Sequence, residues 1–122
     1  MARILVIDDE PELRDVIRRV LERAGHEVRV AADGEAGVVL HRKSPADLVI
    51  TDIYMPGQDG LETLRALRQE GDVKVIVVSG GDRTGMASLR EHAELLGARQ
   101  ALAKPFEMHE LVALVEQVLR EP

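Results

Sequence analysis

The chain has 122 residues, 45% hydrophobic and 31% charged, a length that suits one domain with a single core and leaves no room for a second. No apolar run approaches the roughly 20 residues of a membrane helix, and the absence of cysteine excludes disulfides and thiolate chemistry. The net charge of −6 argues against direct nucleic-acid binding, which needs clustered Lys and Arg, and since no signal-peptide pattern follows Met1 we expect a cytoplasmic protein.

The first half of the chain predicts two strand and helix pairs. A β-branched run over residues 3–7 predicts a strand, and the following helix has Pro11 in its first turn and Gly25 at its end. Its apolar stripe recurs at steps of three and four residues. The stripe consists of Leu13, Val16, Ile17, Val20, Leu21 and Ala24. The second pair is a strand over 27–31 and a helix over 34–42.

The second half predicts three further pairs. A strand over 48–51 precedes a helix over 61–70, and a strand over 73–78 precedes a helix that stops at Gly97. A weaker strand over 100–103 precedes the last helix. The fourth helix carries Met86, Leu89, Ala93 and Leu96, and the last carries Leu111, Val112, Leu114, Val115, Val118 and Leu119. Five βα units, with three strands apolar enough for burial on both faces, predict an α/β fold around a parallel sheet.

Unusual polar residues stand at the ends of the predicted strands. Asp8 and Asp9 follow the first strand, Asp52 the third, Ser79 the fourth and Lys104 the fifth. In a parallel sheet these ends lie at one edge, and right-handed crossovers with the order 2-1-3-4-5 put strands one and three side by side. The three carboxylates are therefore expected to share one pocket, with Ser79 and Lys104 beside it.

Such a carboxylate cluster predicts a bound cation. Two like charges about 4 Å apart repel by roughly 4 kcal/mol at an effective dielectric of 20, so three carboxylates need raised pKa values or a cation. Ligands that are all oxygen favour Mg²⁺. With the metal and Lys104 holding a phosphoryl group and Ser79 donating a hydrogen bond, Asp52 would attack phosphorus to give an acyl phosphate.

Each residue also has an ordinary structural interpretation. Asp9 resembles a helix N-terminus, Asp52 could open a turn, Ser79 could be a loop residue and Lys104 a solvated lysine. Four strand ends with compatible chemistry favour the site over these alternatives.

The four histidines lack ligand spacing, and no glycine-rich nucleotide-binding motif is present. The cationic stretch Arg18, Arg19 and Arg23 predicts a solvated helix face, with a docking role as its alternative.

Together these motifs resemble the receiver domains of two-component response regulators over essentially the whole chain, as a single domain at 1–122. The matching motifs are Ile7-Asp8-Asp9-Glu10, Thr51-Asp52-Ile53-Tyr54-Met55-Pro56-Gly57, Val78-Ser79-Gly80 and Lys104-Pro105-Phe106. The resemblance implies a flavodoxin-like fold, phosphorylation of Asp52, and Mg²⁺ bound by Asp9, Asp52 and the backbone carbonyl of Tyr54, with Asp8 acting more indirectly. It also implies a cis Lys104–Pro105 peptide that aims the lysine inward.

The resemblance further implies partners and a switch. The phosphoryl donor would be a histidine kinase or a phosphotransfer protein, and the chain would act as a monomer or weak homodimer rather than as an enzyme with a separate substrate. Ser79 is the expected switch hydroxyl. Ala101 stands where many members have a switch aromatic, so we expect the loop 79–84 and the fourth helix to move without a ring rotation.

Two other functions compete with this interpretation. A haloacid-dehalogenase-like phosphatase needs a second aspartate two residues after its nucleophile, where this chain has Tyr54. A pseudo-receiver that binds partners without phosphorylation usually lacks the acidic pair or the acceptor, whereas all are retained here. The chain ends at Pro122 soon after the last helix, which suits either a single-domain regulator or a piece of a longer one.

Overall fold

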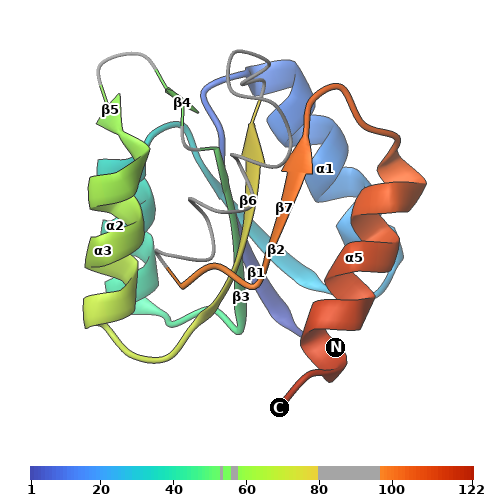
Figure 1. The fold of residues 1–122 in the computed structure, drawn as a ribbon. Coiled ribbons are helices and arrows are strands. Elements are labelled where there is room, and N and C mark those ends of the chain that lie inside the picture. Colours follow the sequence, from blue (N-terminus) through green and yellow to red (C-terminus); the bar gives the residue numbers. More distant parts are fainter. Residues whose placement is uncertain (53, 56–57, 80–96) are drawn as a thin grey trace.

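The computed structural model describes residues 1–52, 54–55, 58–79 and 97–122, and its central feature is a five-stranded parallel sheet (Figure 1). The strands pair in the order β2-β1-β3-β6-β7, which confirms the order predicted from the crossovers. In chain order the elements are β1 (Arg3–Ile7), α1 (Pro11–Arg23), β2 (Glu27–Ala31), α2 (Gly34–Lys43), β3 (Leu48–Asp52), β4 (Tyr54–Met55), β5 (Gln58–Asp59), α3 (Gly60–Gln69), β6 (Lys74–Ser79), β7 (Gln100–Ala103) and α5 (Met108–Arg120).

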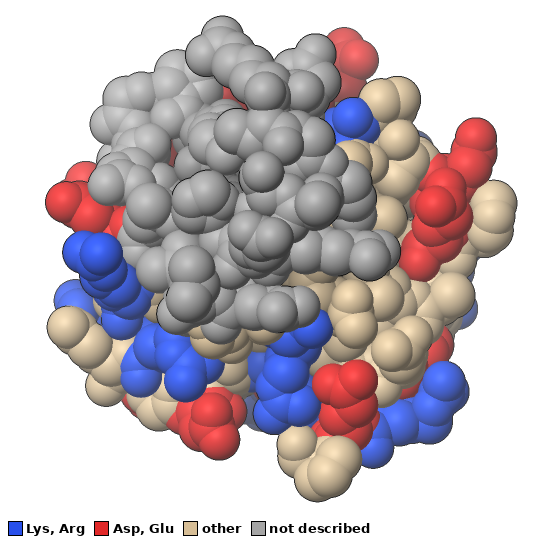
Figure 2. Space-filling model, in the orientation of Figure 1, with Lys and Arg blue, Asp and Glu red and all other residues tan. Residues whose placement is uncertain are grey.

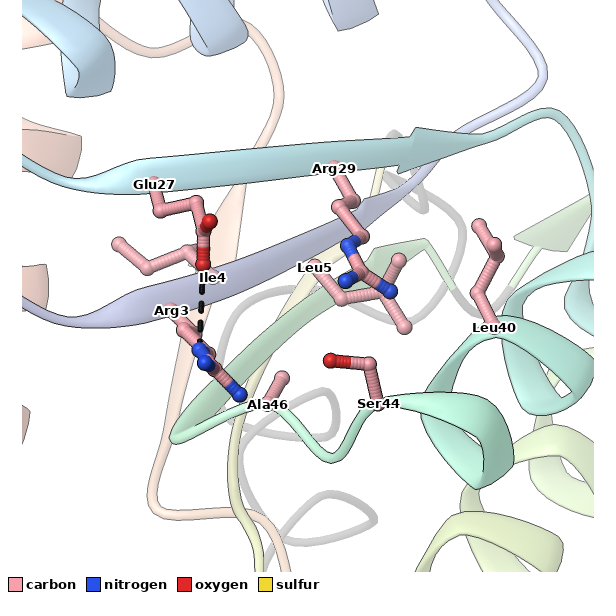
Figure 3. Close-up of a pocket in the computed structure, with 8 residues that line it drawn as sticks. All are labelled: Arg3, Ile4, Leu5, Glu27, Arg29, Leu40, Ser44 and Ala46. Atoms are coloured by element: carbon pink, nitrogen blue, oxygen red, sulfur yellow. Dashed lines mark ion pairs between the residues drawn. The ribbon is translucent and has the colours of Figure 1, made fainter.

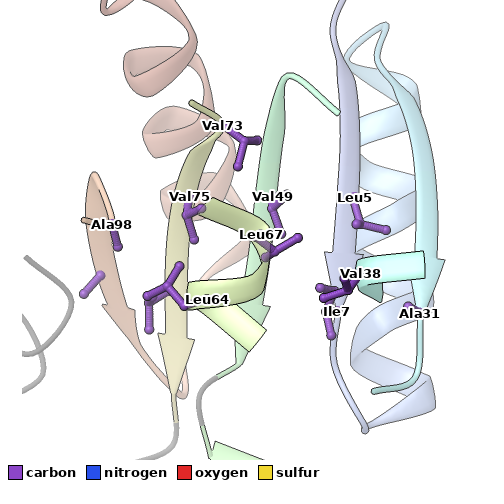
Figure 4. Close-up of a cluster of buried hydrophobic side chains, with 12 residues drawn as sticks. Leu5, Ile7, Ala31, Val38, Val49, Leu64, Leu67, Val73, Val75 and Ala98 are labelled. Carbon is purple, nitrogen blue, oxygen red and sulfur yellow. The ribbon is translucent and has the colours of Figure 1, made fainter. Parts of the chain in front are cut away.

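Helices cover both faces of this sheet. In Figure 1, α2 and α3 lie on one side and α1 and α5 on the other. Because successive side chains on a strand point to opposite faces, β1 contributes to two separate cores. Leu5 and Ile7 join the core under α2 and α3 that Figure 4 shows, and Ile4 and Val6 join the core under α1 and α5. Burial on both faces explains the continuous apolar runs of the central strands.

The structure differs from the sequence-based expectation at a few boundaries. The third strand extends to Asp52, and the fourth runs over Lys74–Ser79 rather than 73–78. A two-stranded antiparallel sheet of β4 and β5, which pairs Tyr54 with Asp59, was not predicted. The predicted fourth helix falls within 80–96, outside the described residues. Among the residues that the structure describes, no helix is long and apolar enough to cross a membrane.

Local sequence signals explain where the first two helices begin and end. Pro11 occupies the first turn of α1, where its missing N–H costs no hydrogen bond. Gly25 follows the C-cap with a φ of 97°, a left-handed conformation that glycine adopts without steric strain. Asp33 caps α2, since its Oδ1 accepts a hydrogen bond from the backbone N–H of Ala36 at 2.8 Å. Both helices thus begin where the sequence predicts, and α2 runs one residue past the predicted end at 42.

Helix α2 approaches the sheet closely at Gly37. A Cβ atom at this position would lie 2.3 Å from Cδ1 and 2.6 Å from Cγ1 of Ile7. Ile7 is fully buried in the last position of β1, so its side chain has little room to move away. Glycine at this helix position therefore permits the close packing of α2 on β1.

We predict that Gly37→Ala lowers the free energy of unfolding by up to about 2 kcal/mol. Overpacking against Ile7 costs about 1–3 kcal/mol, which exceeds the gain of about 1 kcal/mol from replacing glycine inside a helix. Urea denaturation of Gly37→Ala, Ile7→Val and the double variant measures this effect. Since Ile7→Val removes the nearest atom, the double variant should lose less stability than the sum of the two single losses. Strict additivity would contradict the proposed clash.

His41 is a buried histidine in the last turn of α2. Its Nδ1 accepts a hydrogen bond from the backbone N–H of Ala46 at 3.1 Å. Burial lowers the pKa of His41 below its ordinary value, and the negative charge of Glu70 only partly opposes this effect. The folded protein therefore binds a proton at His41 less readily than the unfolded chain does.

We predict that His41 makes the protein less stable as the pH falls below about 6.5, the ordinary histidine pKa. Below that pH the unfolded chain binds the proton first, so the free energy of unfolding decreases until the lower folded pKa is reached. The slope from one such group is at most about 1.4 kcal/mol per pH unit. Denaturation between pH 5 and 8 should show a smaller slope for His41→Gln, whereas His109→Gln, at an exposed position on α5, should keep the wild-type slope.

Candidate functional site

The carboxyl edge of the sheet brings together the polar residues that the sequence singled out. Ile7 of β1 pairs with Thr51 of β3, so Asp8 and Asp52, the residues that follow this pair, lie side by side. Ser79 ends β6 and pairs with Ala103, the last residue of β7, directly before Lys104. The candidate residues at the ends of β1, β3, β6 and β7 thus lie at one edge of the sheet.

Lys104 forms ion pairs with two buried aspartates. Its Nζ donates hydrogen bonds to Oδ2 of Asp52 at 2.8 Å and to Oδ2 of Asp8 at 2.9 Å. Asp8 is 1% exposed and Asp52 3%, while the Lys104 side chain is 12% exposed. The Lys104–Pro105 peptide is cis, as expected from the motif. The interpretation of Lys104 as an ordinary solvated lysine is therefore wrong.

The two carboxylates keep Lys104 charged. Burial by itself would lower the pKa of the ammonium group, but hydrogen bonds to Asp52 and Asp8 and the charges of these carboxylates outweigh it and raise the pKa above its usual range. The stability from this interaction is present below the unfolded pKa of about 10.4 and is lost as the pH rises through the folded pKa. Lys104 is thus a fixed cation at neutral pH.

Backbone hydrogen bonds hold Asp8 in place. Its N–H donates to the carbonyl of Ala31 at 3.1 Å, and its Oδ1 accepts from the N–H of Glu10 at 2.9 Å. The Asp8 carbonyl also accepts a hydrogen bond from Nη1 of Arg14 at 2.8 Å. The sequence offered no sign of this role for Arg14, because one arginine on a helix with several charged residues carries no distinguishing pattern.

Asp9 completes a cluster of three carboxylates. One carboxylate oxygen from each of Asp8, Asp9 and Asp52 lies within 4.8 Å of the others. Asp9 is exposed, and the N-cap of α1 is Glu10, so the interpretation of Asp9 as the helix cap is wrong. Asp9 is thus a carboxylate at the open side of the cluster, next to two buried ones.

The donor set of this cluster fits a hard divalent cation. All three ligands are carboxylates, and such oxygens bind Mg²⁺ in proteins with several waters retained. Tyr54 lies two residues after Asp52, and its backbone carbonyl is the expected further ligand. The backbone of Tyr54 forms part of β4. Its side chain lies outside the described residues. The residues present therefore fit the cation that the sequence predicts.

The two expected switch residues are only partly described. Ala101 is buried in the core under α3, where it pairs with Val77 of β6. The side chain of Ser79 and the loop 80–84 lie outside the described residues, as do Met86 and Leu89. The movement expected for the loop 79–84 and the fourth helix therefore stays a prediction.

Two hollows of the described structure lie away from the acidic cluster. The pocket in Figure 3 sits between β1, β2 and α2, beside the ion pair of Arg3 with Glu27, and has a volume of about 10 Å³. That volume holds about one water molecule. A wider hollow is lined by Ala2, His26 and Lys74, near the opposite edge of the sheet from Asp52. Neither of these two hollows contains the residues proposed for phosphoryl chemistry.

Charges of both signs are mixed on the surface. Figure 2 shows Lys and Arg side chains alternating with Asp and Glu side chains along the lower part of the visible face. Two arginines of the cationic stretch on α1 are also paired, since Arg18 lies 2.6 Å from Asp15 and 2.9 Å from Glu22, and Arg19 lies 3.1 Å from Asp15. This pairing supports the interpretation of that stretch as a solvated helix face.

Comparison with known proteins places the chain in a family. The model of the response regulator receiver domain matches residues 4–116. The chain belongs to this family. Transcriptional regulatory protein CpxR of Escherichia coli K12 is 38% identical over 122 residues, which cover 98% of this chain and 50% of that protein. Response regulator MprA of Mycolicibacterium vanbaalenii is 38% identical over 121 residues, covering 97% and 50%. The chain thus spans about half the length of the curated relatives it matches.

Solved structures agree with this assignment. The receiver domain of the Francisella response regulator 1452 has a TM-score of 0.88 at 28% identity, covering 98% of each chain. The receiver domain of NtrX from Brucella abortus has a TM-score of 0.88 at 30% identity, covering 98% of this chain and 99% of that one. The fold is therefore the flavodoxin-like fold of CheY-like receiver domains, as predicted.

The family assignment supports one of the predicted functions. A receiver domain accepts a phosphoryl group in two-component signalling, interacts with histidine kinases and is generally not a classical enzyme. Receiver domains also bind Mg²⁺ at an acidic pocket, to which the cluster of Asp8, Asp9 and Asp52 corresponds. The phosphatase and pseudo-receiver alternatives are not favoured.

We predict that Asp9→Ala stabilises the metal-free protein while it weakens Mg²⁺ binding at least tenfold. Removing this exposed carboxylate relieves repulsion from Asp8 and Asp52 and should raise the free energy of unfolding by about 0.5–1 kcal/mol. Thermal melts without and with Mg²⁺ measure both effects. Glu12→Ala, an exposed acid in the first turn of α1, is the control and should leave Mg²⁺ binding unchanged without stabilising the metal-free protein. A lower melting temperature for metal-free Asp9→Ala would mean that Asp9 mainly supports the fold.

Proposed function

We propose that Asp52 is the phospho-acceptor of this receiver domain and that Lys104 and Ser79 assist the transfer. The observation that carries the proposal is the contact of 2.8 Å between Nζ of Lys104 and Oδ2 of Asp52, beside the Asp8 and Asp9 carboxylates. Asp52 is the only one of these acids that ends a central strand with a fixed cation on its carboxylate. A nucleophile needs such a defined position relative to the groups that stabilise charge.

The transfer itself requires few protein groups. A carboxylate oxygen of Asp52 attacks the phosphorus of a phosphohistidine donor and forms a P–O bond. The P–N bond breaks, and its electron pair leaves with the donor imidazole, which takes up a proton. Lys104 is already within hydrogen-bond distance of Oδ2 of Asp52 and can turn to an oxygen of the incoming phosphoryl group. Ser79, at the end of β6, would donate a hydrogen bond to a second oxygen of the phosphoryl group.

Mg²⁺ is the proposed cofactor. Asp9, Asp52 and the backbone carbonyl of Tyr54 would hold the ion, with Asp8 supporting it more indirectly. When bound, the ion offsets negative charge on the phosphoryl oxygens. Asp8 is engaged by Lys104 and by the N–H of Glu10, which suits an indirect role. Asp9 is exposed and open to a ligand, which suits direct contact with the metal.

The proposal extends to partners and to output. A histidine kinase or phosphotransfer protein would supply the phosphoryl group in the cytoplasm, and residues 1–122 would act as one receiver domain, as a monomer or weak homodimer. We expect no direct contact with nucleic acid, in line with the net charge of −6. Because Ala101 has no ring to rotate, the switch would depend on Ser79 and the segment that follows it.

We predict that Asp52→Asn abolishes phosphorylation. Incubation with acetyl phosphate and Mg²⁺, followed by intact mass measurement, should show one added phosphoryl group on the wild-type protein and none on this variant. Asp72→Asn changes an exposed aspartate just before β6, at the opposite edge of the sheet, and should remain fully labelled. Undiminished labelling of Asp52→Asn would overturn the assignment.

A further inference from the structure

Glu10 brings a third carboxylate to Lys104. Its Oε2 lies 3.7 Å from Nζ of Lys104, beyond the shorter contacts of that nitrogen with Asp8 and Asp52. The Glu10 side chain is 59% exposed, whereas Asp8 and Asp52 are buried. Glu10 thus lies at the solvent side of the ammonium group, where a phosphoryl donor would enter.

The backbone of Glu10 is fixed while its side chain has no role in capping. The N–H of Glu10 donates to Oδ1 of Asp8 at 2.9 Å, and its carbonyl accepts from the N–H of Arg14 at 3.0 Å. Although Glu10 is the N-cap of α1, its side chain makes no capping hydrogen bond. The carboxylate is therefore available to Lys104 and to the charge of the site.

We propose that Glu10 is a positioning residue that selects among phosphoryl donors by their charge. Its carboxylate draws Lys104 toward the entrance and repels dianionic small-molecule donors more strongly than donors with fewer negative charges. This inference rests on the proposed role of Asp52 as acceptor. The chemical class that Glu10 disfavours is the acyl phosphate dianion, of which acetyl phosphate is the simplest member.

Coulomb repulsion sets the size of the expected effect. Glu10 is solvent-exposed, so its interaction with a dianion is weakened by the high dielectric of water and by salt. At low ionic strength this repulsion corresponds to a rate change of about 2- to 5-fold for a dianion and about the square root of that factor for a monoanion. In about 1 M salt, where the screening length is about 3 Å, the difference should vanish.

The contact with Lys104 can be tested without metal or donor. In the metal-free protein, Glu10→Gln should shift the ¹⁵Nζ resonance of Lys104, because the nearby charge is removed. Glu12→Gln is the matched control, since it removes one negative charge from an exposed position two residues away. It should leave the Lys104 resonance unchanged. Equal shifts in both variants, or none in Glu10→Gln, would overturn the positioning role.

Donor selection is tested by the rate of phosphorylation with Mg²⁺. Acetyl phosphate is a dianion at neutral pH, and phosphoramidate carries one negative charge fewer because its amine is protonated. In each case a P–O bond to Asp52 forms, and acetate or ammonia leaves. Glu10→Gln should raise the rate about 2- to 5-fold with acetyl phosphate and less with phosphoramidate, and Glu10→Asp, which keeps the charge, should stay close to wild type.

The outcomes separate this inference from the proposed function. If the wild-type protein is labelled on Asp52 but Glu10→Gln reacts at the wild-type rate, or gains equally with both donors, the selection by Glu10 is wrong. A gain of the same size in Glu12→Gln would likewise overturn it, since that result reflects overall charge. If the wild-type protein shows no labelling on Asp52, the proposed function fails instead, while the metal-free resonance still reports the contact between Glu10 and Lys104.

Discussion

The ion pairs of Lys104 with Asp8 and Asp52 are the interaction on which the site depends. Two aspartates with almost no exposure would be expensive to keep ionised in a protein interior without a cation. Without the two carboxylates, burial would lower the pKa of Lys104. The three groups therefore form one ion-paired cluster, which joins the end of β7 to the ends of β1 and β3.

The sheet supplies the precision that the site requires. β1 and β3 pair directly, and burial on both faces of the sheet holds their register, because a slip of one residue would exchange the two cores. Of the described acids at the site, Asp9 and Glu10 reach solvent, whereas Asp8 and Asp52 are buried. Asp8 and Asp52 are thus fixed by the sheet beneath them, while Asp9 and Glu10 are accessible from solvent.

Much of the fold and the site could be predicted from the sequence, and the exceptions have physical reasons. Strand ends in a parallel sheet share an edge, which was enough to bring Asp8, Asp9, Asp52 and Lys104 together. The two-residue strands β4 and β5 are too short to show any periodicity, so they were missed. The contacts of Arg14 and Glu10 depend on rotamers and on the height of α1 above the sheet, which no residue pattern encodes.

The tight approach of α2 to β1 has a mechanical consequence for the acidic cluster. Gly37 rests against Ile7, and the next residue in the chain is Asp8, whose carboxylate faces Lys104. An inward displacement of α2 would press on Ile7 and, through one peptide bond, on the acid. Helix α2 is thereby connected to the acidic cluster by a short path through Ile7. A molecule that binds α2 and displaces it toward the sheet would therefore change the position of Asp8 without contacting the acidic cluster.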